Sequence, residues 1–161
     1  MRKSQDRSRR GSELVECALA TLPLLAFLWG ILDVSVAIFV KNTMMFAVRQ
    51  GVRYAVTSQT MQGLGQDASI KSVVNKYSLG LLNALSPNGT NQITITYYNP
   101  VTLEPVTGVG SNAGGNIVVV SATGLTWAWM IPLLRSTAPL QFSVASADVM
   151  EASPIAGPPP R

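Results

Sequence analysis

The sequence predicts an α+β fold in which a long N-terminal helix packs on a small antiparallel sheet, with one additional helix. A continuous helical pattern runs over residues 12–58, apolar at first and amphipathic afterwards. Apolar residues recur at helical spacing again over 67–85. The remaining patterned stretches alternate or are rich in β-branched residues, as strands are, at 92–98, 116–122 and 140–150.

The composition indicates one modest domain with a membrane segment. The chain has 161 residues, of which only 12% are charged, about half the usual share for soluble proteins. Its mean hydropathy is positive. Because a soluble domain of this size needs more charge to cover its surface, we expect part of the chain to face lipid or a partner.

The net charge of +4 is concentrated at the N-terminus. The first ten residues hold five basic side chains and one acidic side chain, and the rest of the chain is close to neutral. A basic end without a basic face argues against nucleic-acid binding. By the positive-inside rule, the cluster predicts that these ten residues stay in the cytoplasm.

The residue types argue against an enzyme. The chain has no histidine and one cysteine, Cys17. The missing histidine excludes Ser-His-Asp and Cys-His catalysis and the usual zinc sites, and a single cysteine cannot form a disulfide within the chain. We therefore expect no catalytic residue, no metal and no cofactor. We interpret Cys17 as an apolar residue of the helix, and the alternative is that it is palmitoylated.

Residues 12–40 are expected to form a transmembrane helix. From Cys17 to Val40 there are 24 residues and one charge, Asp33. At helical rise this stretch is about 36 Å long, enough to cross a hydrocarbon core of about 30 Å. Pro23 is expected to kink or loosen the helix. Asp33 is expected to reach the far interface, where a carboxylate is tolerated.

The helix is expected to continue as a stalk over 41–58, within a head that spans 41–153. The apolar face of the stalk is predicted to pack on the sheet, with Val48, Val52 and Val56 against Ile93, Ile95 and Val118 or Val120. The opposite face carries Arg49 and Arg53, four residues apart, with Gly51 between them to permit close packing. Three roles are open for the two arginines: contact with a partner protein, exposure to solvent, or docking of the head through Asp67, Glu104 or Asp148.

The rest of the head is expected to contain one helix and three strands. The helix over 67–85 is predicted to be capped by Asp67 or Ser69 and to bury Ile70, Val73, Val74, Tyr77, Leu81 and Leu85. The connection 99–115 is predicted to be a loose loop, and the proline-rich tail 154–161 to be disordered. The apolar segment 127–134 has two open interpretations, as core or as a surface that faces a membrane or a partner.

The most specific feature is the junction at residues 7–32. A basic cluster ends in Gly11, and an apolar helix follows with a carboxylate, Glu16, at the fifth position after the glycine. A charge at the edge of a membrane span is costly and needs a purpose. The combination looks like a type IV prepilin processing site, with cleavage between Gly11 and Ser12 and a cytoplasmic leader at 1–11. A glycine lets the backbone extend into a peptidase cleft; the alternative is a plain glycine at the start of the helix.

Further blocks extend this pattern along the helix. They read Gly11-Ser-Glu-Leu-Val-Glu16 with Ala18-Leu19, then Pro23-Leu-Leu and Gly30-Ile-Leu-Asp33, and finally Ala47-Val-Arg-Gln-Gly51-Val-Arg-Tyr-Ala55. Over residues 11–56 the chain resembles the TadE-like proteins of tight-adherence (Flp-type, type IVb) pilus systems. Cys17 and Val48 depart from the family pattern, at positions away from the proposed cleavage.

The resemblance implies a pilin-like fold and a pseudopilin or minor pilin of the bacterial inner membrane. Such a protein is cut by a prepilin peptidase, keeps its N-terminus in the cytoplasm and its head in the periplasm, and acts with other pilin subunits and the assembly machinery in pilus formation, adhesion and biofilm. Glu16 would pair with the new amine that cleavage creates at Ser12 of a neighbouring subunit. The alternative is that Glu16 lies at headgroup level without a partner, and Glu13 is a weaker candidate.

Two other functions fit the same N-terminus. In the first, the chain is a secreted soluble protein whose signal peptide is cut after Ser35-Val-Ala37, so that it begins near Ile38. The apolar stretch is long for a signal peptide, however, and contains Glu16 and Asp33. In the second, the chain is an uncleaved single-pass anchor that carries a small binding head.

Overall fold

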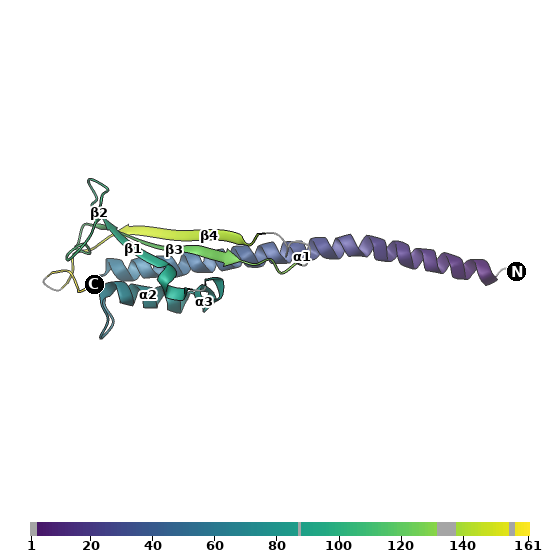
Figure 1. Cartoon of the computed structure of the whole chain (residues 1–161), viewed down its shortest axis with the longest axis horizontal. Coiled ribbons are helices and arrows are strands. Elements are labelled where there is room, and N and C mark those ends of the chain that lie inside the picture. Colours follow the sequence, from purple (N-terminus) through teal and green to yellow (C-terminus); the bar gives the residue numbers. More distant parts are fainter. Residues whose placement is uncertain (1–2, 87, 132–137, 155–156) are drawn as a thin grey trace.

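The computed structural model describes residues 3–86, 88–131, 138–154 and 157–161 and shows a small head on a long helix (Figure 1). The helical elements are α1 (Lys3–Val56), α2 (Gln66–Tyr77), α3 (Leu81–Leu85) and the short 3-10 helix η1 (Gly89–Gln92). The strands are β1 (Ile93–Tyr98), β2 (Pro105–Val106), β3 (Ile117–Trp127) and β4 (Leu140–Val149). The predicted α+β class, with a long helix packed on a small antiparallel sheet, is confirmed.

The long helix α1 begins earlier than the sequence predicted. It contains 54 residues and runs without interruption through Gly11 and Pro23. We expected the helix to start near Ser12, but no proline precedes Pro23, and one glycine in a helix costs only about 1 kcal/mol. The helix ends at Val56, close to the predicted end at Ser58, where the backbone turns to a positive φ of 54°.

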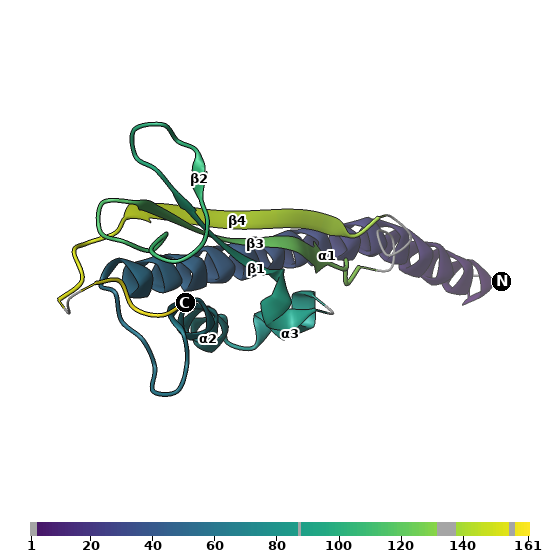
Figure 2. The same ribbon diagram turned by 60° about the vertical axis from the view of Figure 1, so that its left-hand side comes forward.

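The four strands form one antiparallel sheet in the order β2-β1-β3-β4. In Figure 2 the sheet lies along one side of α1, while α2 and α3 lie along the other. Strand β3 contains an irregularity between Ala122 and Leu125, after which its pairing with β4 resumes. This extra stretch carries the β3–β4 hairpin far along α1, toward the N-terminal half of the helix.

The core forms where α1 meets the sheet, as the sequence predicted. The three stalk valines, Val48, Val52 and Val56, share one buried cluster with Ile93, Val118 and Val120. Ile95 is only partly buried and packs against this cluster from outside. Two further large side chains, Met44 of the amphipathic stalk and Tyr97 of β1, are almost completely buried in it.

The predicted second helix is two helices. Leu79 and Gly80 both have positive φ values, 54° and 79°, and separate α2 from α3. The break shifts the buried face, so that Leu82 is fully buried and Tyr77 is 39% exposed. The predicted caps are wrong, because Gly65 occupies the N-cap position without a side-chain cap.

Several segments of the head that lack a regular sequence pattern make defined contacts in the structure. The connection 99–115 contains β2 and two buried polar residues, Ser111 and Asn112. In the tail 154–161, for which disorder is predicted, Arg161 forms an ion pair with Asp67 at 2.7 Å, and residues 155–156 lie outside the described part. In the apolar segment 127–134, Trp127 ends β3 and Ile131 is buried, whereas residues 132–134 lie outside the described part.

Candidate functional site on the long helix

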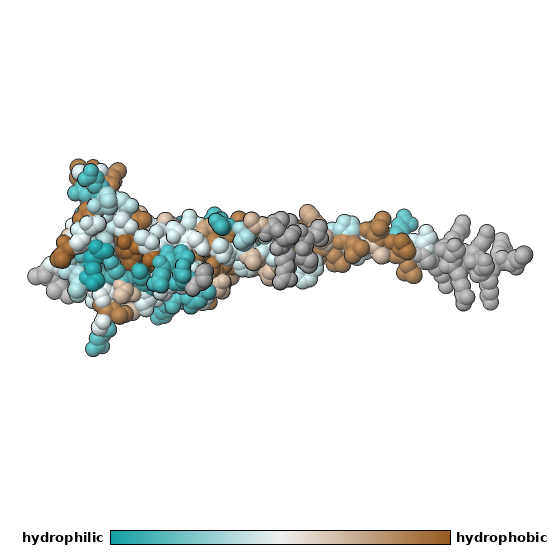
Figure 3. Space-filling model, viewed as in Figure 1, coloured by the Kyte–Doolittle hydropathy of each residue, from teal (hydrophilic) through white to brown (hydrophobic). Residues whose placement is uncertain are grey.

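The N-terminal half of α1 projects from the head with its apolar side chains exposed. Over Ser12–Leu32 every side chain is exposed or half-exposed, including Trp29 and Phe27 at 60% and 68%. In the space-filling view, hydrophobic residues are prominent on the visible face of this part of the helix, with some hydrophilic residues among them (Figure 3). Within the described part of the chain, one helix, Ser12–Val56, is long and apolar enough to cross a membrane.

Burial of α1 by the head begins at Asp33. From there the inward face is buried at regular helical spacing, at Asp33, Ala37, Val40, Met44 and Val48. The part before this point, residues 12–32, is about 31 Å long at 1.5 Å per residue. The segment 33–40, which we predicted to belong to the membrane span, therefore has one face packed against the head.

Asp33 joins the helix to the tip of the β3–β4 hairpin. Its carboxylate is 2% exposed and accepts three hydrogen bonds from the hairpin. Trp127 Nε1 donates to Oδ1 at 3.1 Å, and the backbone N–H groups of Met130 and Ile131 donate to Oδ2 at 2.9 and 3.2 Å. The sequence missed this role, since the partners lie 94 to 98 residues away along the chain.

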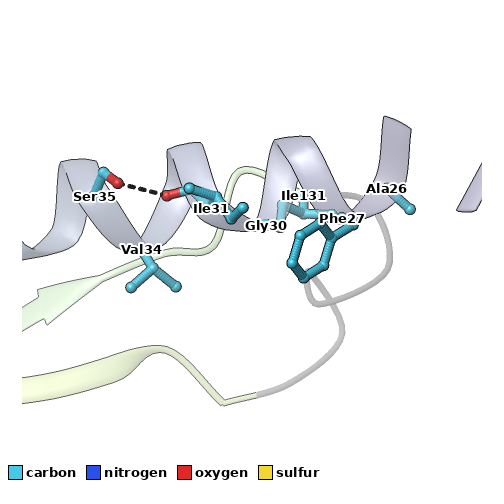
Figure 4. Close-up of a pocket in the computed structure, with 7 residues that line it drawn as sticks. All are labelled: Ala26, Phe27, Gly30, Ile31, Val34, Ser35 and Ile131. Atoms are coloured by element: carbon cyan, nitrogen blue, oxygen red, sulfur yellow. Dashed lines mark hydrogen bonds between the residues drawn. The ribbon is translucent and has the colours of Figure 1, made fainter. Parts of the chain in front are cut away.

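An apolar groove lies next to this junction. Figure 4 shows its lining side chains, which come from one turn after another of α1 and from the hairpin residue Ile131. The groove has a volume of about 530 Å³ and is lined by Ala26, Phe27, Gly30, Ile31, Val34, Ser35 and Ile131. The mostly apolar surface of the projecting helix thus continues as far as Ile131 of the head, with Ser35 as the polar residue in the groove lining.

The candidate processing and pairing residues lie at the other end of the projecting helix. Gly11 has helical backbone, and Ser12, Glu13 and Glu16 follow it on the same helix with exposed side chains. Glu16 has no hydrogen-bond or ion-pair partner among the described residues. At helical rise, Glu16 and Asp33 are about 25 Å apart, so the two carboxylates stand near opposite ends of the exposed apolar segment.

Arg49 and Arg53 lie on the outer face of the stalk. Both side chains are exposed, and neither forms an ion pair with a described residue. Asp67, one of their predicted partners, binds Arg161 instead. Between them, Gly51 faces α2 so closely that a Cβ would overlap Val74 Cγ2. The expectation that Gly51 permits close packing is therefore confirmed, while contact of the arginines with a partner protein stays a prediction.

The described part of the chain does not bring three metal-ligating side chains together. No group of three or more His, Cys, Asp or Glu residues that could hold a metal ion is found among those residues. The polar groups of the junction at Asp33 instead bind one another, since the Asp33 carboxylate accepts hydrogen bonds from three N–H groups. The geometry of this junction therefore fixes the relative position of two protein segments.

These features define a class of protein: a small α+β head carried on one helix that has the length and surface of a membrane span. Sequence comparison is more specific. A family model described as TadE-like protein matches residues 11–53, which confirms the resemblance read from the sequence. No curated protein and no solved structure gave a significant match. The matched segment contains Glu16, Asp33, Arg49 and Arg53, and it indicates a protein related to tight-adherence pili.

Proposed function

We propose that this chain is a pseudopilin or minor pilin that is anchored in the inner membrane and supports assembly of a tight-adherence pilus and adhesion to surfaces. The observation that carries the proposal is the position of the family match on α1. The TadE-like match begins at Gly11, where the basic cluster of the sequence gives way to the apolar run, and it extends to residue 53, within the part of α1 that packs against the head. The segment that matches the family model thus contains the proposed membrane anchor and most of the part of α1 that packs in the head.

The proposed topology places residues 1–11 in the cytoplasm, residues 12–32 in the bilayer and the head in the periplasm. The basic cluster before Gly11 supports this orientation through the positive-inside rule. The end of β3, with Met130 and Ile131 after it, and the start of β4 then lie near the membrane surface. Their exposed apolar side chains, Met130 at 57% and Leu140 at 40%, suit such a position.

In this proposal a prepilin peptidase cuts between Gly11 and Ser12, and Glu16 pairs with the new amine of a neighbouring subunit. The physical support is the exposure of Glu16 on a helix that otherwise presents apolar side chains. An unpaired carboxylate in lipid costs roughly 3 kcal/mol on insertion scales. Pairing between subunits removes part of this cost and favours one register of assembly.

Secretion as a soluble protein is less well supported. A signal-peptide cut after Ala37 would fall inside continuous helix, at a side chain that is 6% exposed. It would also remove Asp33, which holds the hairpin tip. An uncleaved single-pass anchor has the same architecture and differs from the proposal only at Gly11.

Complementation of a host that lacks this gene tests the proposal. We expect the wild-type chain to restore surface pili, measured as pilin sheared from intact cells. Gly11→Val should fail because the bulkier residue blocks processing, and Glu16→Ala should fail because it removes the pairing charge. Glu13→Ala is the matched control, one turn away and exposed, and should restore pili. Full restoration by Gly11→Val and Glu16→Ala would contradict both assigned roles.

A further inference from the structure

The C-terminal residues 157–161 occupy a polar site at the far end of the head from the projecting helix (Figure 1). The site lies between the start of α2, strand β1 and the loop at 108–112, and Arg161 is its central occupant. The Asp67 carboxylate Oδ2 accepts from Arg161 Nη2 at 2.7 Å and from Nε at 3.0 Å. Ser111 Oγ accepts from Nη1 at 2.6 Å. The guanidinium carbon also lies 4.8 Å from the centre of the Tyr97 ring.

The same site also forms hydrogen bonds with the backbone carbonyls of the two prolines before Arg161. The Gln66 backbone N–H donates to the carbonyl of Pro160 at 2.7 Å, and Asn112 Nδ2 donates to the carbonyl of Pro159 at 2.8 Å. Both protein groups are donors, so they match a segment that has carbonyls but no N–H groups at its prolines. A proline-rich segment also loses little entropy on binding, because it is already extended.

The receptor groups are held in place by the head itself. Gln66, Ser111 and Asn112 are each at most 1% exposed. Gln66 Nε2 donates to the carbonyl of Ala55 at 3.1 Å, and its Oε1 accepts from Asn112 Nδ2. The Tyr97 hydroxyl donates to Asp67 Oδ1 at 2.9 Å and so orients the carboxylate toward the guanidinium. Among the described residues, Asn112 Oδ1 is buried without a hydrogen-bond partner. Asn112 also borders a cavity of about 660 Å³ that Pro158–Arg161 line as well.

We propose that this is a recognition site for a proline-rich segment that carries an arginine, and that residues 158–161 of the chain occupy it in cis. The pattern of contacts selects the ligand class: a planar guanidinium for the Asp67–Ser111–Tyr97 group and two proline carbonyls for Gln66 and Asn112. When the chain's own segment leaves, the site accepts another segment of the same chemistry. This inference is independent of the proposed role in pilus assembly.

Peptide binding in trans tests the inference on the full-length chain in detergent micelles. The probe is a labelled, amidated peptide with the sequence of residues 157–161, and binding is followed by fluorescence anisotropy. The variant Arg161→Ala frees the site by removing the cis guanidinium, and we expect it to bind the peptide saturably. The wild-type chain should bind at least tenfold more weakly, because its own segment competes.

Two second substitutions, each added to Arg161→Ala, distinguish specific peptide binding at this site from nonspecific peptide binding. Adding Asp67→Asn to Arg161→Ala should lower the affinity at least tenfold, since it removes the charge that faces the guanidinium. Adding Gly65→Ala should have a similar effect by another route, because a Cβ there would overlap the backbone of Arg161. A peptide with lysine in place of arginine should bind more weakly than the original, since lysine lacks the planar fork.

Absence of saturable binding to a folded Arg161→Ala chain would overturn the inference, as would binding that Asp67→Asn leaves unchanged. Circular dichroism establishes that each variant is folded. If Arg161→Ala does not fold, the same titration on Arg161→Lys tests the inference instead. That variant keeps the positive charge but loses the planar guanidinium group.

Discussion

Asp33 is the residue whose role changed most between sequence and structure. As the one charge in a 24-residue apolar run, it was expected at the far membrane interface, in contact with solvent. In the structure it is buried and accepts hydrogen bonds from Trp127, Met130 and Ile131. A buried carboxylate with three donors fixes the position of residues 127–131 relative to α1. These residues cannot separate from α1 or shift along it without breaking hydrogen bonds to a carboxylate.

Replacement of Asp33 by alanine is expected to destabilise the head. The change leaves the buried N–H group of Ile131 and two partly buried donors, the Trp127 indole and the Met130 N–H group, without their acceptor, at a cost of about 3 kcal/mol. Asp33→Asn keeps one acceptor oxygen and should have a smaller effect. Urea unfolding in mild detergent, followed by tryptophan fluorescence, measures the change. Ser35→Ala, an exposed neighbour whose hydroxyl binds only its own helix, is the control. A loss within about 0.5 kcal/mol for Asp33→Ala would show that the junction contributes little.

Tyr97 gives the head a predicted dependence on alkaline pH. Burial, with the neighbouring charge and hydrogen bond of Asp67 adding to it, raises the pKa of the Tyr97 phenol well above its ordinary value of about 10. A raised pKa in the folded state favours the protonated form there. The contribution of the protonated Tyr97 phenol to the free energy of unfolding is therefore fully present below about pH 10. Above that pH the free energy of unfolding falls, by up to about 1.4 kcal/mol per pH unit.

The control for this pH dependence is Tyr97→Phe, which cannot ionise. Unfolding free energies measured between pH 8 and pH 11 should fall more steeply for the wild type than for this variant. Parallel curves for the two chains would contradict the assignment.

At the scale of elements, regular patterns were predictable and interruptions were not. Alternation located β1 and β4 to within a residue or two, and hydropathy located α1. The break at Leu79 and Gly80 was missed because these residues lie inside a stretch with helical apolar spacing. The ion pair between Arg161 and Asp67 could not be predicted from composition either. The two residues lie 94 positions apart in the sequence and are brought together only by the tertiary fold.

The contact between α1 and α2 depends on Gly51. A Cβ at this position would overlap Val74 Cγ2, and a valine in a helix has one strongly preferred rotamer and cannot easily move away. Gly51→Ala should therefore destabilise the head by about 1–3 kcal/mol, despite the better helix propensity of alanine. Gly30→Ala is the matched control, because its Cβ would lie 3.9 Å from Ile131 Cδ1, an ordinary contact. Equal unfolding free energies for the two variants would contradict the packing argument.

At the scale of the whole molecule, the head and the exposed helix divide the chain at Asp33. The projecting segment 12–32 matches the thickness of a bilayer core, about 30 Å. Its two ends carry the two carboxylates of interest, Glu16 without a partner among the described residues and Asp33 bound to the head. The sequence predicted the candidate residues at the N-terminal end of this segment, whereas the junction at the other end required the structure.

The N-terminus and intact mass of the protein recovered from its host's membranes test the central claim most directly. The proposal predicts a membrane-bound chain that begins at Ser12, together with loss of this species when Gly11 is replaced by valine. A soluble chain that begins near Ile38 would contradict the membrane anchor, and a chain with an intact N-terminus would contradict processing at Gly11.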